Sequence, residues 1–150
     1  MADHKGHRDR VKRRFLDSGL DGFAEHNVLE LLLFYAIPQR DVNLIAHELI
    51  ERFGSLAAVF DAPVQELQKV PYIGENAAVL IKLIPELGRR YSVSKAQLGD
   101  IVNSTGDAGR YLLPYFFGET DEVVYLLCLD GKGKVLFCRE AMMSTIYETL

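Results

Sequence analysis

The residues best placed to do chemistry are a tight hairpin at Pro71 to Gly74 between two predicted helices, together with the start of the second helix. Gly74 is expected to supply the positive φ or the close backbone approach that so short a hairpin requires. The backbone amides near Gly74 would lie at the N-terminus of the second helix, where the helix dipole favours an anion such as a phosphate. This pattern predicts a helix-hairpin-helix that contacts nucleic-acid phosphates. The residues expected at that contact are Tyr72, Ile73, Gly74, Glu75 and Asn76.

A second interpretation of the same stretch stays open. Glu75 and Asn76 follow the glycine at positions where basic residues would strengthen a prediction of DNA binding. A carboxylate there competes with a phosphate for the positive end of the helix. The hairpin could instead be a compact helix junction or a surface that contacts another protein.

The N-terminal segment is rich in basic residues. Arg10, Arg13 and Arg14 fall on neighbouring positions of a helix that we expect to begin near residue 8. These arginines could contact phosphates electrostatically, or they could belong to a solvated arm that leads into the helix. Both interpretations are kept.

Charge and composition restrict the classes of function. A net charge of −4 over 150 residues argues against nucleic-acid binding by the whole surface, although a local basic patch is still allowed. No apolar run approaches the roughly 20 residues that cross a bilayer, and the charged N-terminus has no apolar segment typical of a signal peptide. We therefore expect a cytoplasmic protein with no membrane partner. Cys128 and Cys138 flank a predicted hairpin and could face each other, but we favour two half-buried, reduced thiols.

The hydrophobic pattern predicts a helical first part of the chain. Residues 25–37 are apolar on nearly every face, which indicates a central buried helix that ends at Pro38. Pro85 should kink the helix that follows the hairpin, and residues 92–99 are typical of a linker. The helices expected on either side of the hairpin lie at about 25–37, 43–53, 56–60 and 75–91.

The second part of the chain has a different character. A helix of about ten residues ending near Phe117 precedes a buried strand at 122–130, a turn at 130–134 and a return strand at 135–142. A hairpin with one helix cannot bury these apolar residues unaided. The predicted fold class is therefore α+β, with a helical helix-hairpin-helix domain at 1–93 and the incomplete start of an α/β domain at 99–150.

Several segments, in order along the chain, resemble the bacterial RadC family. The resemblance covers nearly the whole chain and implies a helix-hairpin-helix domain followed by a JAB/MPN domain similar to metalloproteases. It also implies an association with DNA repair, which is the historical label of the family. The segments that carry the resemblance are His7–Arg10, Phe15–Phe23, Leu29–Pro38, Arg52–Leu56, Ile73–Ala78 and Leu127–Lys134.

The resemblance further implies a candidate catalytic residue. In the zinc-dependent isopeptidases that the second domain resembles, a glutamate, a His-x-His pair and an aspartate organise the zinc ion and its water. Glu140 lies where the early glutamate of the family is expected. It would act as the general base on the metal-bound water.

This chain departs from the family pattern after Glu140. No His-x-His follows it, and all four histidines lie between His4 and His47. Met143-Ser144-Thr145 stands where the family usually has a glycine-threonine pair. Because catalytic zinc needs about three protein ligands, we expect no metal site and no cofactor in this chain. It is similar to a C-terminally truncated member that cannot perform the family's chemistry alone.

Three functions stay open at this point. The leading hypothesis is DNA binding through the phosphate backbone, without sequence preference, by the hairpin and the basic arm. The second is a zinc-dependent hydrolase of the JAB/MPN class, active only if the chain is completed. The third is a protein-interaction module in which an exposed strand edge pairs with a partner or with another copy of the chain.

Overall fold

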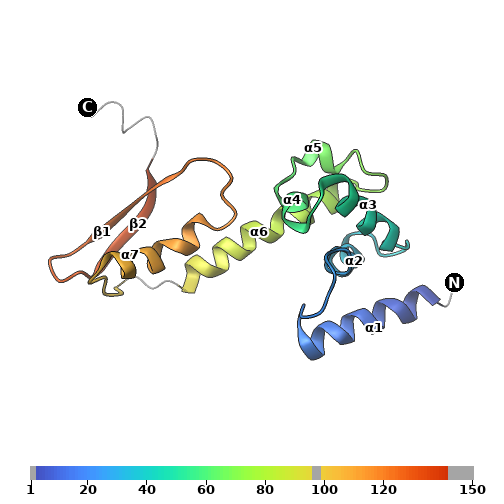
Figure 1. Ribbon diagram of the computed structural model, residues 1–150, viewed down its shortest axis with the longest axis horizontal. Helices are drawn as coiled ribbons and strands as arrows, with labels where there is room; N and C mark the ends of the chain where they lie inside the picture. The colour runs from blue at the N-terminus through green and yellow to red at the C-terminus, as the bar shows by residue number, and fades with distance from the viewer. Residues whose placement is uncertain (1–2, 96–98, 142–150) are drawn as a thin grey trace. The chain divides into compact units, whose positions relative to one another are not determined.

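The computed structural model describes residues 3–95 and 99–141 (Figure 1). The chain divides into two compact units, residues 1–84 and 85–150. The described elements are helices and one two-stranded antiparallel sheet, so the expected combination of helix and strand is confirmed. No helix in the described ranges is long and apolar enough to cross a membrane. The elements are α1 Asp3–Ser18, α2 Glu25–Ala36, α3 Asn43–Phe53, α4 Leu56–Asp61, α5 Val64–Leu67, α6 Glu75–Lys95, α7 Thr105–Leu112, the 3₁₀ turn η1 Leu113–Phe116, β1 Val124–Leu129 and β2 Val135–Ala141.

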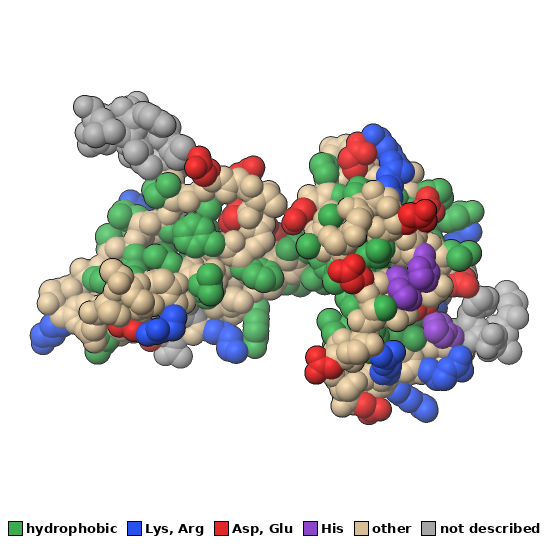
Figure 2. All heavy atoms as spheres, in the orientation of Figure 1, with side chains coloured by type: hydrophobic (Ala, Val, Ile, Leu, Met, Phe, Trp, Pro, Cys, Tyr) green, Lys and Arg blue, Asp and Glu red, His purple; other side chains and the backbone are tan. Residues whose placement is uncertain are grey.

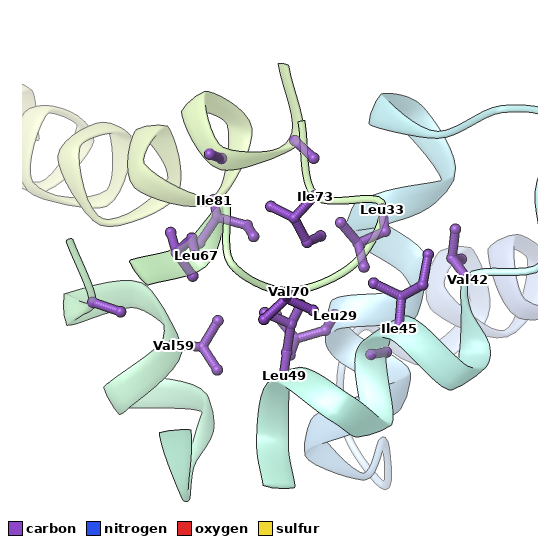
Figure 3. Packing of buried hydrophobic residues seen from close by; sticks show 14 of the residues in the cluster. Leu29, Leu33, Val42, Ile45, Leu49, Val59, Leu67, Val70, Ile73 and Ile81 are labelled. Carbon is purple, nitrogen blue, oxygen red and sulfur yellow. The ribbon is translucent and has the colours of Figure 1, made fainter. Parts of the chain in front are cut away.

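The core of unit 1 is built around α2, as its apolar sequence predicted. Leu29 and Leu33 of α2 are fully buried. Figure 3 shows that buried side chains of α2, α3, α4, α5, the hairpin and the start of α6 point toward one another. The residues labelled there are Leu29, Leu33, Val42, Ile45, Leu49, Val59, Leu67, Val70, Ile73 and Ile81.

The hairpin between α5 and α6 is part of this core. Val70 and Ile73 are 1% and 3% exposed, and the amide of Ile73 donates to the carbonyl of Val70 over 3.1 Å. Ala77 and Ala78 at the start of α6 are also buried. Small side chains at these two positions let α6 lie close to its neighbours. The apolar residues of the hairpin are therefore part of the core.

One charged side chain lies inside the apolar core of unit 1. Glu30 of α2 is fully buried, and its carboxylate lies 2.8 Å from Nε2 of His7 on α1. Asn27 donates more weakly to the other carboxylate oxygen, over 3.5 Å. A buried carboxylate needs such partners because leaving it unpaired in an apolar core is costly. The pair therefore ties α1 to α2, which the apolar pattern of residues 25–37 did not indicate.

The expected linker at residues 92–99 is partly wrong. Helix α6 continues past Tyr91 to Lys95, with Pro85 inside it. Lys95 in the last turn is favourable there, because a cation stabilises the negative end of a helix dipole. Residues 96–98 of the expected linker lie outside the described residues. The two domains expected at 1–93 and 99–150 stay a prediction.

Unit 2 contains the predicted hairpin. Strands β1 and β2 pair antiparallel with Tyr125 opposite Glu140, and a bulge interrupts the register at Cys128 and Leu129. In the turn, the Asp130 side chain accepts the amides of Lys132 and Lys134, over 2.8 and 2.9 Å. These backbone hydrogen bonds lower the pKa of Asp130 below its usual value.

A short segment extends the sheet beside the start of β2. The amide of Val102 donates to the carbonyl of Gly133 over 2.7 Å, and the amide of Val135 donates to the carbonyl of Asp100 over 2.8 Å. Val102, Val135 and Tyr111 of α7 are the buried centre of unit 2. This core is small, so the backbone fit between Val102 and the turn matters for its stability.

The two cysteines do not face each other across the hairpin. Cys138 lies opposite Leu127, whereas Cys128 lies opposite Phe137. Directly opposed residues share a face of an antiparallel sheet and neighbouring residues alternate, so the two thiols are on opposite faces. Both are free and half-buried, as we favoured.

Gly133 provides a test of the fit between the turn and Val102. It has φ +78°, and a Cβ added to it would lie 2.5 Å from the carbonyl oxygen of Val102. Gly133→Ala is expected to destabilise unit 2 by more than about 2 kcal/mol, through backbone strain and this clash. Hydrogen exchange of residues 99–141, measured in the full chain, should show lost amide protection.

The matched control is Gly131→Ala in the same turn. Nothing lies within 4 Å of a Cβ added at Gly131, and its φ is not positive. Exchange in this variant should resemble that of the parent protein. Equal protection in the Gly133 and Gly131 variants would contradict the packing described here.

Candidate functional site

An open groove of about 860 Å³ lies where the hairpin meets the loop between α2 and α3. The loop contributes residues 36–41, and the hairpin and the start of α6 contribute Tyr72 and residues 74–77. Residues separated by more than thirty positions in sequence thus form one surface. Of the five hairpin residues expected at a phosphate contact, four line this groove, and Ile73 is buried in the core instead.

The hairpin presents unoccupied backbone donors to this groove. The carbonyl of Gly74 accepts the amide of Ala78 over 3.0 Å, so Gly74 is the N-cap of α6. The first amides of an α-helix have no acceptor within the helix. Among the described residues, none accepts a hydrogen bond from the amides of Gly74, Glu75 or Asn76. These donors, at the positive end of a 21-residue helix, are suited to an anion.

The conformation expected for Gly74 is wrong. Gly74 does not have a positive φ, and no atom lies within 4 Å of a Cβ added to it. The positive φ of the hairpin belongs to Tyr72, at +69°. The turn must reverse the chain within a few residues. It places the left-handed backbone conformation at Tyr72, two positions before Gly74, where the sequence predicted it.

A guanidinium lies against the Tyr72 ring in the same groove. The guanidinium carbon of Arg40, in the α2–α3 loop, lies 3.8 Å from the centre of the Tyr72 ring. A cation this close to an aromatic face is attracted by the ring. No pattern in the sequence pointed to Arg40, because it is a single arginine in a loop and its position beside the hairpin depends on the packing of α2 and α3.

Arg8 of α1 holds the loop that carries Arg40. Its guanidinium donates to the carbonyls of Phe34, Ile37 and Arg40 over 3.0, 2.8 and 2.6 Å. The same group lies 4.7 Å from the centre of the Phe34 ring. Carbonyls at the C-terminal end of a helix lack intrahelical partners, and a cation is favourable there. Arg8 therefore acts as a structural clamp on the loop between α2 and α3.

The arginines expected at a phosphate contact, Arg10, Arg13 and Arg14, are exposed on α1 and do not line the groove. Figure 2 shows Lys and Arg side chains gathered over α1. Arg14 donates to the carbonyl of Gly22, and its guanidinium lies 4.4 Å from the centre of the Phe23 ring. Their role in phosphate contact stays a prediction.

Two carboxylates reduce the positive potential of the groove. Asp41 and Glu75 both line it. One oxygen of Asp41 accepts the amide of Asn43, the first residue of α3, over 3.0 Å. Glu75 is exposed in the first turn of α6. An anion bound here would therefore depend on directed hydrogen bonds from amides and Arg40 more than on net charge.

Glu140, the candidate catalytic residue, lies in unit 2. It is exposed on β2 and lines a cavity of about 330 Å³ together with Arg89, Tyr115, Tyr125 and Cys138, among others. Burial raises the pKa of the Tyr115 and Tyr125 phenols and of the Cys138 thiol. A hydrogen bond to Glu86 raises the pKa of Arg89.

The residues around Glu140 do not match a zinc site. Among residues 3–95 and 99–141, no group of three or more His, Cys, Asp or Glu side chains is placed to hold a metal ion. A catalytic zinc requires about three such ligands around one point. We derive no catalytic step through a metal, and the role of Glu140 stays a prediction.

Comparison with known proteins supports the RadC resemblance at the level of the family. The chain is 45% identical over 85 residues to a UPF0758 protein of Fusobacterium nucleatum subsp. nucleatum, and UPF0758 is the RadC family. These residues are 57% of this chain and 37% of that protein, so the chain spans well under half the length of this curated relative. No model of a protein family and no solved structure matches the chain.

The clamp by Arg8 can be tested on stability. Arg8→Ala removes three hydrogen bonds from a charged donor and is expected to destabilise unit 1 by about 2 kcal/mol. Arg13→Ala is the control, since Arg13 is an exposed arginine of the same helix with no hydrogen bond in the described structure, and such changes usually stay within about 0.5 kcal/mol. Urea unfolding that shifts equally in the two variants would disprove the clamp.

Proposed function

We propose that this chain is a RadC-like, DNA repair-associated protein of the cytoplasm that binds the phosphate backbone of DNA through its helix-hairpin-helix. The observation that carries the proposal is the arrangement at the groove. Gly74, Glu75 and Asn76, whose amides have no acceptor among the described residues, line the same groove as Arg40. A phosphate oxygen is an acceptor that suits both kinds of donor.

Several properties of the site support backbone contact in place of base recognition. The backbone amides and Arg40 can donate to phosphate oxygens, which are the same for every base. Phosphate contacts carry no sequence information directly. Binding should therefore show little sequence preference. Because each neutralised phosphate releases counterions, the affinity should fall steeply as salt is raised.

The second part of the chain enters the proposal through the family resemblance. In this proposal, residues 99–150 correspond to part of a JAB/MPN domain, as the family resemblance implies. The alternative is a zinc-dependent hydrolase of the JAB/MPN class.

Gly74→Asp tests phosphate binding without damaging the fold. Aspartate is a favoured N-cap residue, and its side chain would accept an amide of the first turn of α6 while repelling phosphate. We expect unchanged or slightly higher stability and at least about tenfold weaker DNA binding, since an added carboxylate and lost amides together cost more than about 1.4 kcal/mol. Fluorescence anisotropy with labelled DNA at low salt measures the affinity.

The control for the added charge is Gln65→Glu. Gln65 is exposed on α5 and does not line the groove, so the same change of charge should affect binding by less than about twofold. The proposal is wrong if the parent chain binds neither duplex, branched nor single-stranded DNA at low salt. It is also wrong if the Gly74 and Gln65 variants bind DNA equally.

A second candidate function, protein association, is favoured by the exposed apolar face of the hairpin in unit 2. Val124, Leu126 and Phe137 share one face of the hairpin by the strand register and are between 41% and 45% exposed. Figure 2 shows apolar side chains at the surface of this unit. The outer edge of β1 has no paired strand among the described residues, and its sequence contains no charge or proline that would block pairing.

Leu126→Lys tests this association. The lysine would place a charge on the apolar face and discourage pairing of β1 with a strand of a partner or another copy. Sedimentation velocity should show self-association of the parent chain at high concentration and its loss in the variant. A strict monomer for the parent chain would exclude self-association through this face.

A further inference from the structure

We propose that Tyr72 and Arg40 form a stacking platform for an unpaired base, so that the hairpin prefers single-stranded DNA to continuous duplex. This inference rests on the DNA binding proposed above and assigns its substrate class. It is argued from the backbone conformation of Tyr72, the position of its ring and the other residues that line the same groove.

The backbone at Tyr72 is unusual. Tyr72 is the only residue other than glycine with a positive φ in the described part of the chain. The left-handed region is unfavourable for a residue with a Cβ, and residues held there are concentrated at functional sites. A glycine at position 72 would form the same turn without this cost.

The core does not need an aromatic ring at this position. Tyr72 is 61% exposed, whereas its neighbour Ile73 is 3% exposed and supplies the apolar anchor of the hairpin. The ring therefore contributes little to burial. A strained residue that displays a large, exposed aromatic group is better explained by contact with something outside the chain.

The ring is also held in place. The guanidinium of Arg40 stacks at 3.8 Å from its centre, and the carbonyl of Arg40 accepts a hydrogen bond from Arg8 over 2.6 Å. Arg8 thus fixes the loop, the loop carries Arg40, and Arg40 orients the ring. A ring that is oriented before binding loses less conformational freedom when a base stacks on it.

The platform adjoins the proposed phosphate site. Tyr72 and Arg40 line the same groove as Gly74 and Asn76, whose amides have no acceptor among the described residues. A nucleotide whose phosphate is bound by the amides could therefore place its base against the ring. An aromatic face accepts any base, so this arrangement adds no strong sequence preference.

Only an unpaired base can use such a platform. In a duplex, each base is already stacked on its neighbours within the helix, and its faces are not accessible to a side chain. In a single strand or an overhang, one base face is free and can stack on tyrosine. The ring should therefore strengthen single-strand binding and leave duplex binding to the phosphate contacts.

The experiment compares three versions of the full chain on three DNA probes at one salt concentration. The probes are a mixed-sequence 20-nucleotide single strand, the blunt duplex of the same sequence and that duplex with a short overhang. Tyr72→Phe keeps the ring. Tyr72→Asn removes the ring and suits the left-handed backbone, since asparagine tolerates this conformation well. Thermal unfolding of both variants confirms that the hairpin is intact.

We expect the parent chain and Tyr72→Phe to bind the single strand about tenfold more tightly than the blunt duplex, with the overhang probe close to the single strand. In Tyr72→Asn this ratio should fall to about one. A 2-aminopurine in the single strand should lose fluorescence on binding the parent chain, through stacking, and lose less on binding Tyr72→Asn.

The outcomes separate the two proposals. If the parent chain binds the duplex in a salt-dependent manner but shows no single-strand preference, or if Tyr72→Asn keeps the preference, the platform is wrong and backbone binding stands. If Tyr72→Asn weakens all three probes in parallel, the ring serves the phosphate site and not base stacking, and the platform is again wrong. If the parent chain binds no probe, the proposed function itself fails.

Discussion

The burial of two residues of a short turn, Val70 and Ile73, is the constraint on which the candidate site depends. Both side chains lie in the core of unit 1, so the chain must reverse between Leu67 and Glu75 with little freedom. That reversal begins a long helix at the protein surface and leaves its first amides without acceptors among the residues that the structure describes. The apolar side chains of Val70 and Ile73 cannot accept hydrogen bonds from the first amides of α6. Packing of the turn in the core therefore leaves a polar surface at the start of this helix.

The rest of the groove is positioned by a chain of polar contacts that begins on α1. Arg8 donates to carbonyls at the end of α2 and in the following loop, and this loop places Arg40 against Tyr72. A second contact, between His7 and the buried Glu30, fixes α1 to the core next to Arg8. Two neighbouring residues of the basic N-terminal segment are therefore structural, and they support the site without lining it.

The sequence predicted much of the fold because its signals were local or periodic. The continuous apolar run of α2, the proline after it and the small residues Ala77 and Ala78 each act through near neighbours. The turn at Asp130 likewise follows from a few consecutive residues. Predictions were less successful where two conformations satisfy the same local pattern. A glycine at position 74 indicated a left-handed residue, but the turn places that conformation at Tyr72, and residues 92–95 continue a helix where their polar composition suggested a linker.

The amino-acid sequence by itself determined the helices, the hairpin and the presence of a helix N-terminus that could meet an anion, since these depend on spacing along the chain. It also indicated the RadC resemblance, which the similarity to a UPF0758 protein supports. Only the tertiary structure brought Arg40 to Tyr72 and assigned Arg8 to three carbonyls. Those contacts join residues about thirty positions apart, and a single arginine in a loop has no periodicity that could reveal its partner before the helices pack.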